Sequence, residues 1–263
     1  MMWAPLGNSW YDSLQVKVTK RYSRGIDFTA AYTFSKNLTT VEDQDGTAVP
    51  VNDVFNRRNQ KAISRVDQPH VFVVGFNYQS PVWRKNVLTR VALSGWTLGG
   101  ILRYASGMPI RVPGANNNLN ALLFRGTFAN RVTGQPLFLK DLNCHCIDPN
   151  KEFVLNPAAW SDPAPGQWGT SAAYYTDYRY ARRPDEQMSI GKLFRIRESK
   201  TLQIRAEFFN VFNRTYMNNP DSGNAAATQT LDRGVPVSGF GRINAGSLFN
   251  PPRNGQLVAR FQW

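Results

Sequence analysis

Three short groups of residues in this sequence carry side chains that do chemistry in other proteins. In the first, Cys144, His145 and Cys146 are adjacent. A zinc site takes four ligands, commonly from two separated cysteine pairs, and the only other histidine is His70. In an oxidising compartment the cysteines form a disulfide more readily, although spanning one residue strains the chain. The sequence therefore favours a loop disulfide between Cys144 and Cys146, with free thiols and a metal site as the open alternatives.

The second group is acidic and the third pairs a histidine with an aspartate. Residues 42–46 read Glu-Asp-Gln-Asp-Gly, which is rich in oxygen ligands but lacks the ligand series and final glutamate of an EF-hand. Asp67 lies three residues before His70, and such a pair serves hydrolases as base and orienter. No serine stands in a Gly-x-Ser-x-Gly elbow, however. We therefore predict a solvated acidic loop, a hydrogen-bonding His70 at the rim of the fold, no enzymatic activity and no cofactor or metal.

These groups lie between segments that alternate apolar and polar residues. The last nine residues set the pattern, because Leu257, Ala259, Phe261 and Trp263 share one face of an extended chain while Gln256, Arg260 and Gln262 share the other. A period of two predicts a half-buried strand. Six earlier segments alternate in the same way, namely 13–22, 26–35, 72–78, 96–105, 186–195 and 202–208, the last continuing to Phe212. Gly95, Gly99 and Gly100 suggest a bend in the fourth of these strands.

The connections between the seven segments are short, long, medium, long, short and long. They cover residues 23–25, 36–67, 80–94, 107–185, 196–200 and 213–254. Successive connections of an antiparallel sheet lie at opposite ends, so every long loop emerges on one side, as in outer-membrane barrels. We predict an all-β fold: an antiparallel meander of about seven long strands that forms part of a transmembrane β-barrel wall, with long irregular loops on one side. Two unpaired edges should remain, near 13–22 and 256–263.

Composition and charge narrow the class of protein. With 42% hydrophobic and 13% aromatic residues, the chain is too apolar for disorder. The longest uncharged stretch near Trp96, residues 91–102, is too short for a membrane helix. The net charge is +13, and the basic residues that produce it are scattered along the chain. Basic and aromatic residues take opposite faces of the same strands. A nucleic-acid-binding surface would interleave them on one face, so we predict no nucleic-acid partner. Residues 1–7 lack a secretory signal and run almost directly into a strand, so an upstream segment is expected.

A barrel wall gives each face of these strands a role. The charged residues of the polar face are predicted to point into the lumen; they are Lys17, Arg103, Arg205, Glu207 and Arg260. The apolar face is predicted to contact outer-membrane lipid, with an aromatic girdle at each membrane interface. The girdle residues lie near strand ends; they are Trp10, Trp83, Trp96, Trp263, Tyr22, Tyr32, Tyr78 and Tyr104.

Several stretches also resemble a known family. The hairpin of residues 8–36, the motifs Gly95-Trp-Thr-Leu-Gly-Gly-Ile-Leu and Leu202-Gln-Ile-Arg-Ala-Glu-Phe-Phe-Asn-Val-Phe-Asn213, and the end Gly255-Gln-Leu-Val-Ala-Arg-Phe are similar to Oar-like TonB-dependent outer-membrane transporters. The resemblance spans nearly the whole chain. It implies that residues 1–263 are one incomplete domain, the C-terminal portion of a barrel of twenty-two strands in the cell outer membrane that takes up an unidentified ligand.

The same resemblance implies the partners. The remaining barrel strands and the plug would lie N-terminal to this chain, and the energy-coupling complex of the inner membrane would act through that plug. Leu257, Ala259, Phe261 and Trp263 would form the C-terminal signal that the barrel-assembly machinery recognises. A structural or adhesive surface protein without transport is the alternative, and a soluble basic nucleic-acid-binding β-protein is a more distant one.

Overall fold

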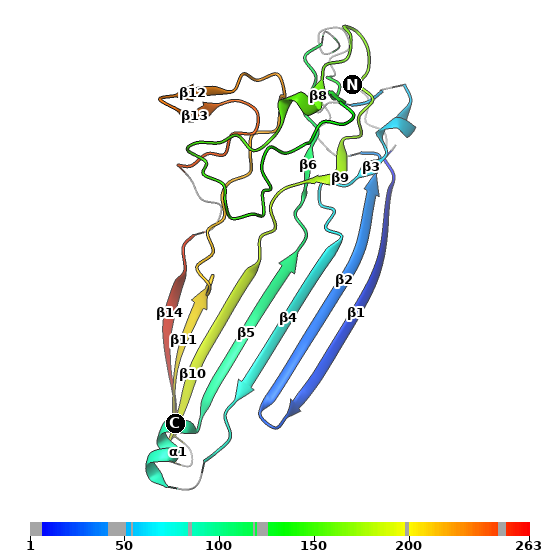
Figure 1. Cartoon of the computed structure of the whole chain (residues 1–263). Helices are drawn as coiled ribbons and strands as arrows, with labels where there is room; N and C mark the ends of the chain where they lie inside the picture. The colour runs from blue at the N-terminus through cyan, green and yellow to red at the C-terminus, as the bar shows by residue number, and fades with distance from the viewer. Residues whose placement is uncertain are drawn as a thin grey trace.

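The computed structural model describes residues 7–41, 51–53, 55–83, 86–117, 119, 126–197, 200–246 and 251–263. Most of the strand residues belong to one antiparallel sheet, in which seven long strands follow each other in chain order (Figure 1). These strands are β1 (Ser9–Ser23), β2 (Ile26–Thr39), β4 (His70–Gln79), β5 (Trp96–Ala105), β10 (Asp185–Arg197), β11 (Lys200–Phe209) and β14 (Asn254–Gln262). The short β3 (Ala62–Ile63) pairs with β2, and β1 and β14 end the path. The predicted all-β meander, its neighbour pairing and its two edge strands are confirmed.

The turn between β1 and β2 shows how local sequence fixes the register. Arg24 and Gly25 both have positive φ, 54° and 84°, which is the two-residue hairpin turn that matches the twist of the flanking strands. A Cβ on Gly25 would lie 2.4 Å from the carbonyl oxygen of Gln79. Only glycine therefore fits between this turn and the end of β4.

The short and long connections separate as predicted. The β1–β2 turn, the C-terminus and the helix α1 (Val87–Leu93) lie at one end of the sheet, while the long connections gather at the other (Figure 1). The helix itself was not predicted. Its signal is a capping box, in which the Asn86 side chain accepts from the Thr89 N–H and the Thr89 hydroxyl accepts from the Asn86 N–H. No helix in the described parts of the chain is long and apolar enough to cross a membrane.

Lys192 of β10 lies on the same side of the sheet as Trp96 and Ile190, and its contacts with α1 explain this position. The Lys192 Nζ donates to the carbonyl oxygens of Val91 (2.6 Å) and Ala92 (3.0 Å). It also lies 4.5 Å from the centre of the Trp96 ring. The ammonium therefore binds carbonyls in the last turn of α1 while its aliphatic stem covers apolar surface.

Two sequence predictions concern strand shape. β5 keeps its register with β4 unbroken from Val71↔Ala105 to Gln79↔Thr97, across Gly99 and Gly100, while Gly95 directly before the strand has a positive φ of 78°. A Cβ at Gly100 would lie 2.9 Å from the ring of Phe76, so this glycine makes room for an aromatic side chain on the neighbouring strand. β11 ends at Phe209 and does not reach Phe212, because Asn210 takes the left-handed conformation with φ 51°.

The long connections, which gather on one side of the sheet as predicted, also contain short regular elements and a buried core. Together they form a folded unit, here called the cap, made of the described residues within 51–67, 107–184 and 210–253. Its short elements are two 3-10 helices (Arg57–Gln60 and Pro157–Ala159) and the strands β6 (Pro109–Arg111), β7 (Asn130–Arg131), β8 (Trp160–Ser161), β9 (Tyr174–Arg179), β12 (Thr230–Asp232) and β13 (Val235–Ser238).

The cap holds the buried hydrophobic core of the described chain. Ile110, Val112, Val154, Leu155 and Tyr178 are fully buried there. The apolar side of the long sheet, in contrast, keeps large side chains such as Leu14, Ile190 and Leu257 exposed. An ordinary water-soluble sheet would cover such a face, so the sheet and the cap are built for two different surroundings.

Candidate functional site

The strand register confirms that the sheet has two chemically distinct faces. Phe72, Leu98, Ile190, Ile204 and Leu257 lie on one of them, here called the apolar face. The opposite face, the polar face, carries Lys17, Arg103, Arg205, Glu207 and Arg260. The five charged residues expected to share a face therefore do so.

Their contacts on the polar face differ. Arg103 donates to the Gln68 side chain at 2.9 Å. Arg205 and Gln256 both bind the Glu207 carboxylate. Lys17 and Arg260 are exposed, and neither forms an ion pair with any residue that the structure describes. Water surrounds such charges on a polar face far more readily than a hydrophobic core does.

Aromatic residues of the apolar face form two levels. Near the cap, Tyr32, Phe72 and Tyr104 are directly paired across β2, β4 and β5. Near the short turns lie Tyr78 and Trp96. Trp96 and Tyr104 are eight residues apart, which at about 3.3 Å per residue is roughly 26 Å along the strand, or about 20 Å across a membrane at a typical tilt of about 40°. The apolar band of an outer-membrane barrel is about 25 Å tall, so the two levels fit its two interfaces.

The four residues predicted as an assembly signal end the apolar face. Phe261 of β14 pairs with Leu202 of β11, and Ala259 pairs with Ile204. Trp263 follows the last strand residue, stacks on Phe261 with ring centres 6.1 Å apart, and is 85% exposed. An exposed terminal aromatic pair at the short-turn end matches the position of the girdle at that interface.

Asp67 and His70 do not form the pair that a hydrolase would need. The His70 Nδ1 instead hydrogen-bonds the hydroxyl of Tyr32 at 2.8 Å. The Asp67 carboxylate is 2% exposed, accepts from the N–H of Asn37 at 2.8 Å and forms an ion pair with Arg179 of β9 at 2.6 Å. Asp67 therefore fastens the cap to β2, and His70 lies at the rim of the sheet as predicted.

A second fastening, between the cap and β10, was not predicted from the sequence. Glu186 lies on the apolar face of β10 and is 1% exposed, because Arg214 of the cap binds it through two nitrogens at 2.7 and 3.1 Å. The hydroxyl of Tyr104 donates to the same carboxylate at 2.9 Å. These hydrogen bonds raise the pKa of Arg214. The one signal in the sequence was an acidic residue on a strand face whose other side chains, apart from Lys192, are apolar.

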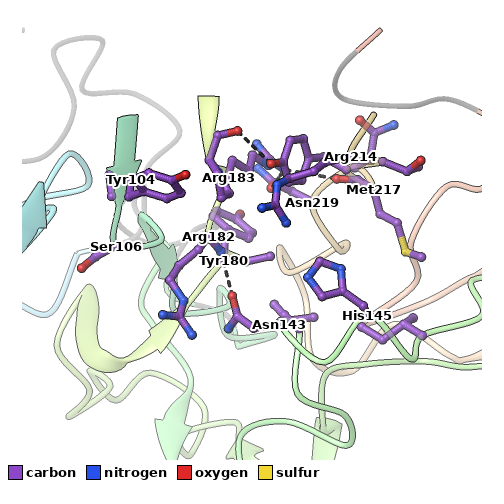
Figure 2. Close-up of a pocket in the computed structure, with 18 of the residues that line it drawn as sticks. Tyr104, Ser106, Asn143, His145, Tyr180, Arg182, Arg183, Arg214, Met217 and Asn219 are labelled. Carbon is purple, nitrogen blue, oxygen red and sulfur yellow. Dashed lines mark hydrogen bonds between the residues drawn. The ribbon is translucent and has the colours of Figure 1, made fainter. Parts of the chain in front are cut away.

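Between these two fastenings lies a cavity of about 480 Å³. Its floor is the cap-side end of the apolar face, with Tyr32, Phe72 and Tyr104, and its walls come from three segments of the cap, residues 142–147, 180–184 and 214–220. Figure 2 shows Arg182, Arg183, Arg214 and His145 arranged around it. Apolar and cationic side chains thus line the same cavity, and we take it as the candidate binding site.

The cysteines border this cavity. The structure joins Cys144 and Cys146 through a disulfide, with Cα atoms 5.1 Å apart. His145 between them has a left-handed backbone, φ 51°, and its side chain lines the cavity. Among the residues that the structure describes, no three His, Cys, Asp or Glu side chains gather as a metal site. The acidic stretch 42–46 lies outside the described residues.

The Asp67–Arg179 fastening carries a stability prediction. Changing Asp67→Asn in the intact protein leaves Arg179 as a buried charge without its partner, which destabilises by about 3–5 kcal/mol. The matched control is Asp177→Asn, because the Arg131–Asp177 pair of the cap is exposed, with side chains 32% and 56% accessible. Water screens this pair, so its loss should cost less than the loss of the buried pair although both oxygens of Asp177 accept from Arg131. The free energy of unfolding of each variant is measured by urea denaturation, with protease cleavage within the cap as the signal of unfolding. Equal losses of stability in the two variants would contradict the fastening role of Asp67.

Comparison with known proteins agrees with this geometry. A search of curated proteins and a search of solved structures found no match. A family model described as outer membrane beta barrel domain matches residues 1–256, nearly the whole chain. The two-faced sheet, its two aromatic levels and the separation of short turns from long connections are the features of such a domain. The chain therefore belongs to the outer membrane beta barrel domain family, and its place is the outer membrane.

Proposed function

We propose that this chain is the C-terminal part of the barrel of a TonB-dependent transporter that takes up an unidentified ligand. The observation that carries the proposal is the open sheet, in which β1 and β14 each have only one neighbour among the described strands. Exposed backbone groups are not tolerated in hydrocarbon, so both edges call for further strands. Barrels large enough to hold a plug, with about twenty-two strands, are those of outer-membrane transporters.

The polar face and the cap support the same proposal. Charged and amide side chains along the inside of a wide barrel suit a wet lumen around a plug. A cap with its own hydrophobic core presents a defined surface to the outside medium, where a ligand would first be captured. The plug, the energy-coupling complex acting through it and the barrel-assembly machinery are the partners under this proposal, and the chain itself carries out no chemical reaction.

Uptake in cells tests the transport function. Strains with and without the gene are grown in the same medium, and mass spectrometry follows the depletion of its solutes with and without a protonophore. A transporter depletes at least one solute faster in the strain with the gene, and the protonophore removes the difference. Identical depletion profiles across ligand-rich media would contradict transport.

The alternative is a structural or adhesive surface protein. The folded cap favours it equally, because a rigid external surface also suits contact with other cells or matrix. Attachment of the same two strains to matrix-coated surfaces separates the alternatives, since adhesion requires no proton-motive force.

A further inference from the structure

We infer that the cavity between the cap and the apolar face binds the phosphate-bearing headgroup, with a net negative charge, of a lipid from the outer leaflet of the membrane. This site is separate from any transported ligand, because its floor is the lipid-facing side of the wall and not the lumen side. The inference therefore does not rest on the proposed transport function.

The position of the cavity is the first argument. Its floor residues Tyr32, Phe72 and Tyr104 form the cap-side aromatic level, where the hydrocarbon gives way to headgroups. These three residues keep 37%, 40% and 36% of their surface accessible. Long loops of such barrels face the outside, so this level belongs to the outer leaflet. A lipid beside the wall would place its chains along the apolar face and its headgroup under the cap.

Charge is the second argument. The described residues that line the cavity include three arginines and two histidines, and no aspartate or glutamate. Glu186 lies behind the lining and is already bound by Arg214. Burial raises the pKa of Tyr216 to about 12, so this lining hydroxyl adds no negative charge at neutral pH. The site is therefore complementary to an anion.

The third argument is an available guanidinium. Arg183 is held by the carbonyl of Met217 and the side chain of Asn219. Arg182 uses only its backbone N–H, which donates to Asn143 at 2.9 Å, and its exposed side chain has no partner within the described ranges. Figure 2 shows the Arg182 and His145 side chains among the residues that line the cavity. A guanidinium fork is the side chain best matched to phosphate oxygens.

The test uses the intact protein in detergent with diphosphoryl lipid A as probe, and native mass spectrometry measures how much lipid is bound. The wild type should bind lipid A in preference to phosphatidylcholine. Arg182→Gln and His145→Gln should each weaken binding about tenfold or more, because each removes a charge-assisted contact. Arg233→Gln is the matched control, an exposed arginine in the β12–β13 turn outside the cavity, and should leave the affinity unchanged.

A second measurement needs no variant. Lipid A should slow hydrogen exchange in residues 142–147 and 180–184 of the wild type, while inorganic phosphate alone should not. Equal protection by free phosphate would overturn the lipid assignment in favour of a soluble anion. Equal loss of binding in Arg233→Gln, or no preference over phosphatidylcholine, would overturn the site itself.

Discussion

Removal of Phe261, Gln262 and Trp263 from the intact gene product is expected to abolish its insertion into the outer membrane while synthesis and export continue. Phe261 pairs with Leu202 at the end of the β11–β14 ladder, and Trp263 stacks on it at the short-turn end of the apolar face. These two aromatic side chains end the strand that would close the barrel. Surface protein, measured by protease accessibility in whole cells, should fall at least about tenfold, since a barrel that does not close leaves backbone groups unpaired in lipid.

Point variants show whether the loss of insertion comes from the missing aromatic side chains or from the shorter chain. The double change Phe261→Ser and Trp263→Ser should reproduce the loss, because it removes both apolar-face aromatics. Gln262→Ser, which changes the residue of the polar face between them, should insert normally. Normal surface accumulation of the truncated protein would contradict the assembly role of this segment.

The second large effect concerns this 263-residue polypeptide made alone, which is expected not to insert as a monomeric pore. Each edge strand of the sheet leaves about four or five residues with outward-pointing backbone groups. An unpaired group in hydrocarbon costs several kcal/mol, so the two edges together cost tens of kcal/mol. That exceeds the roughly 5–15 kcal/mol of net stability of a typical folded protein.

Refolding into detergent and liposomes measures this outcome. The polypeptide should aggregate, or associate with copies of itself to close a ring, and should give no steady conductance as a monomer in a planar bilayer. The intact gene product, refolded in the same way, is the control. A compact monomer of this polypeptide that shifts on heating in gels and conducts steadily would contradict the prediction.

The sequence was most informative where structure is local. The alternation from Gly255 to Trp263 places Leu257 and Phe261 together whatever the rest of the chain does, because successive side chains of a strand point to opposite faces. The pair Arg24 and Gly25 specifies a hairpin turn in the same way. The seven strands, their order and their two faces follow from such short-range rules, joined to the tendency of sequential strands to pair.

Those short-range rules could not predict the cap. Its strands have two to six residues, too few for a periodic signal, and its core joins residues far apart in the chain. Asp67 and Arg179 are 112 residues apart, so no spacing rule connects them, and the nearer His70 was the natural partner to consider.

What the sequence determined by itself is a two-faced antiparallel sheet for a membrane, since periodicity and turn chemistry act between neighbours in the chain. What only the tertiary structure decided is the folded cap, its ion pairs through Asp67 and Glu186, and the cationic cavity that these pairs flank. Those features depend on which distant segments pack together. That packing is determined by the shapes of the segments and by the need of each buried charge for a partner.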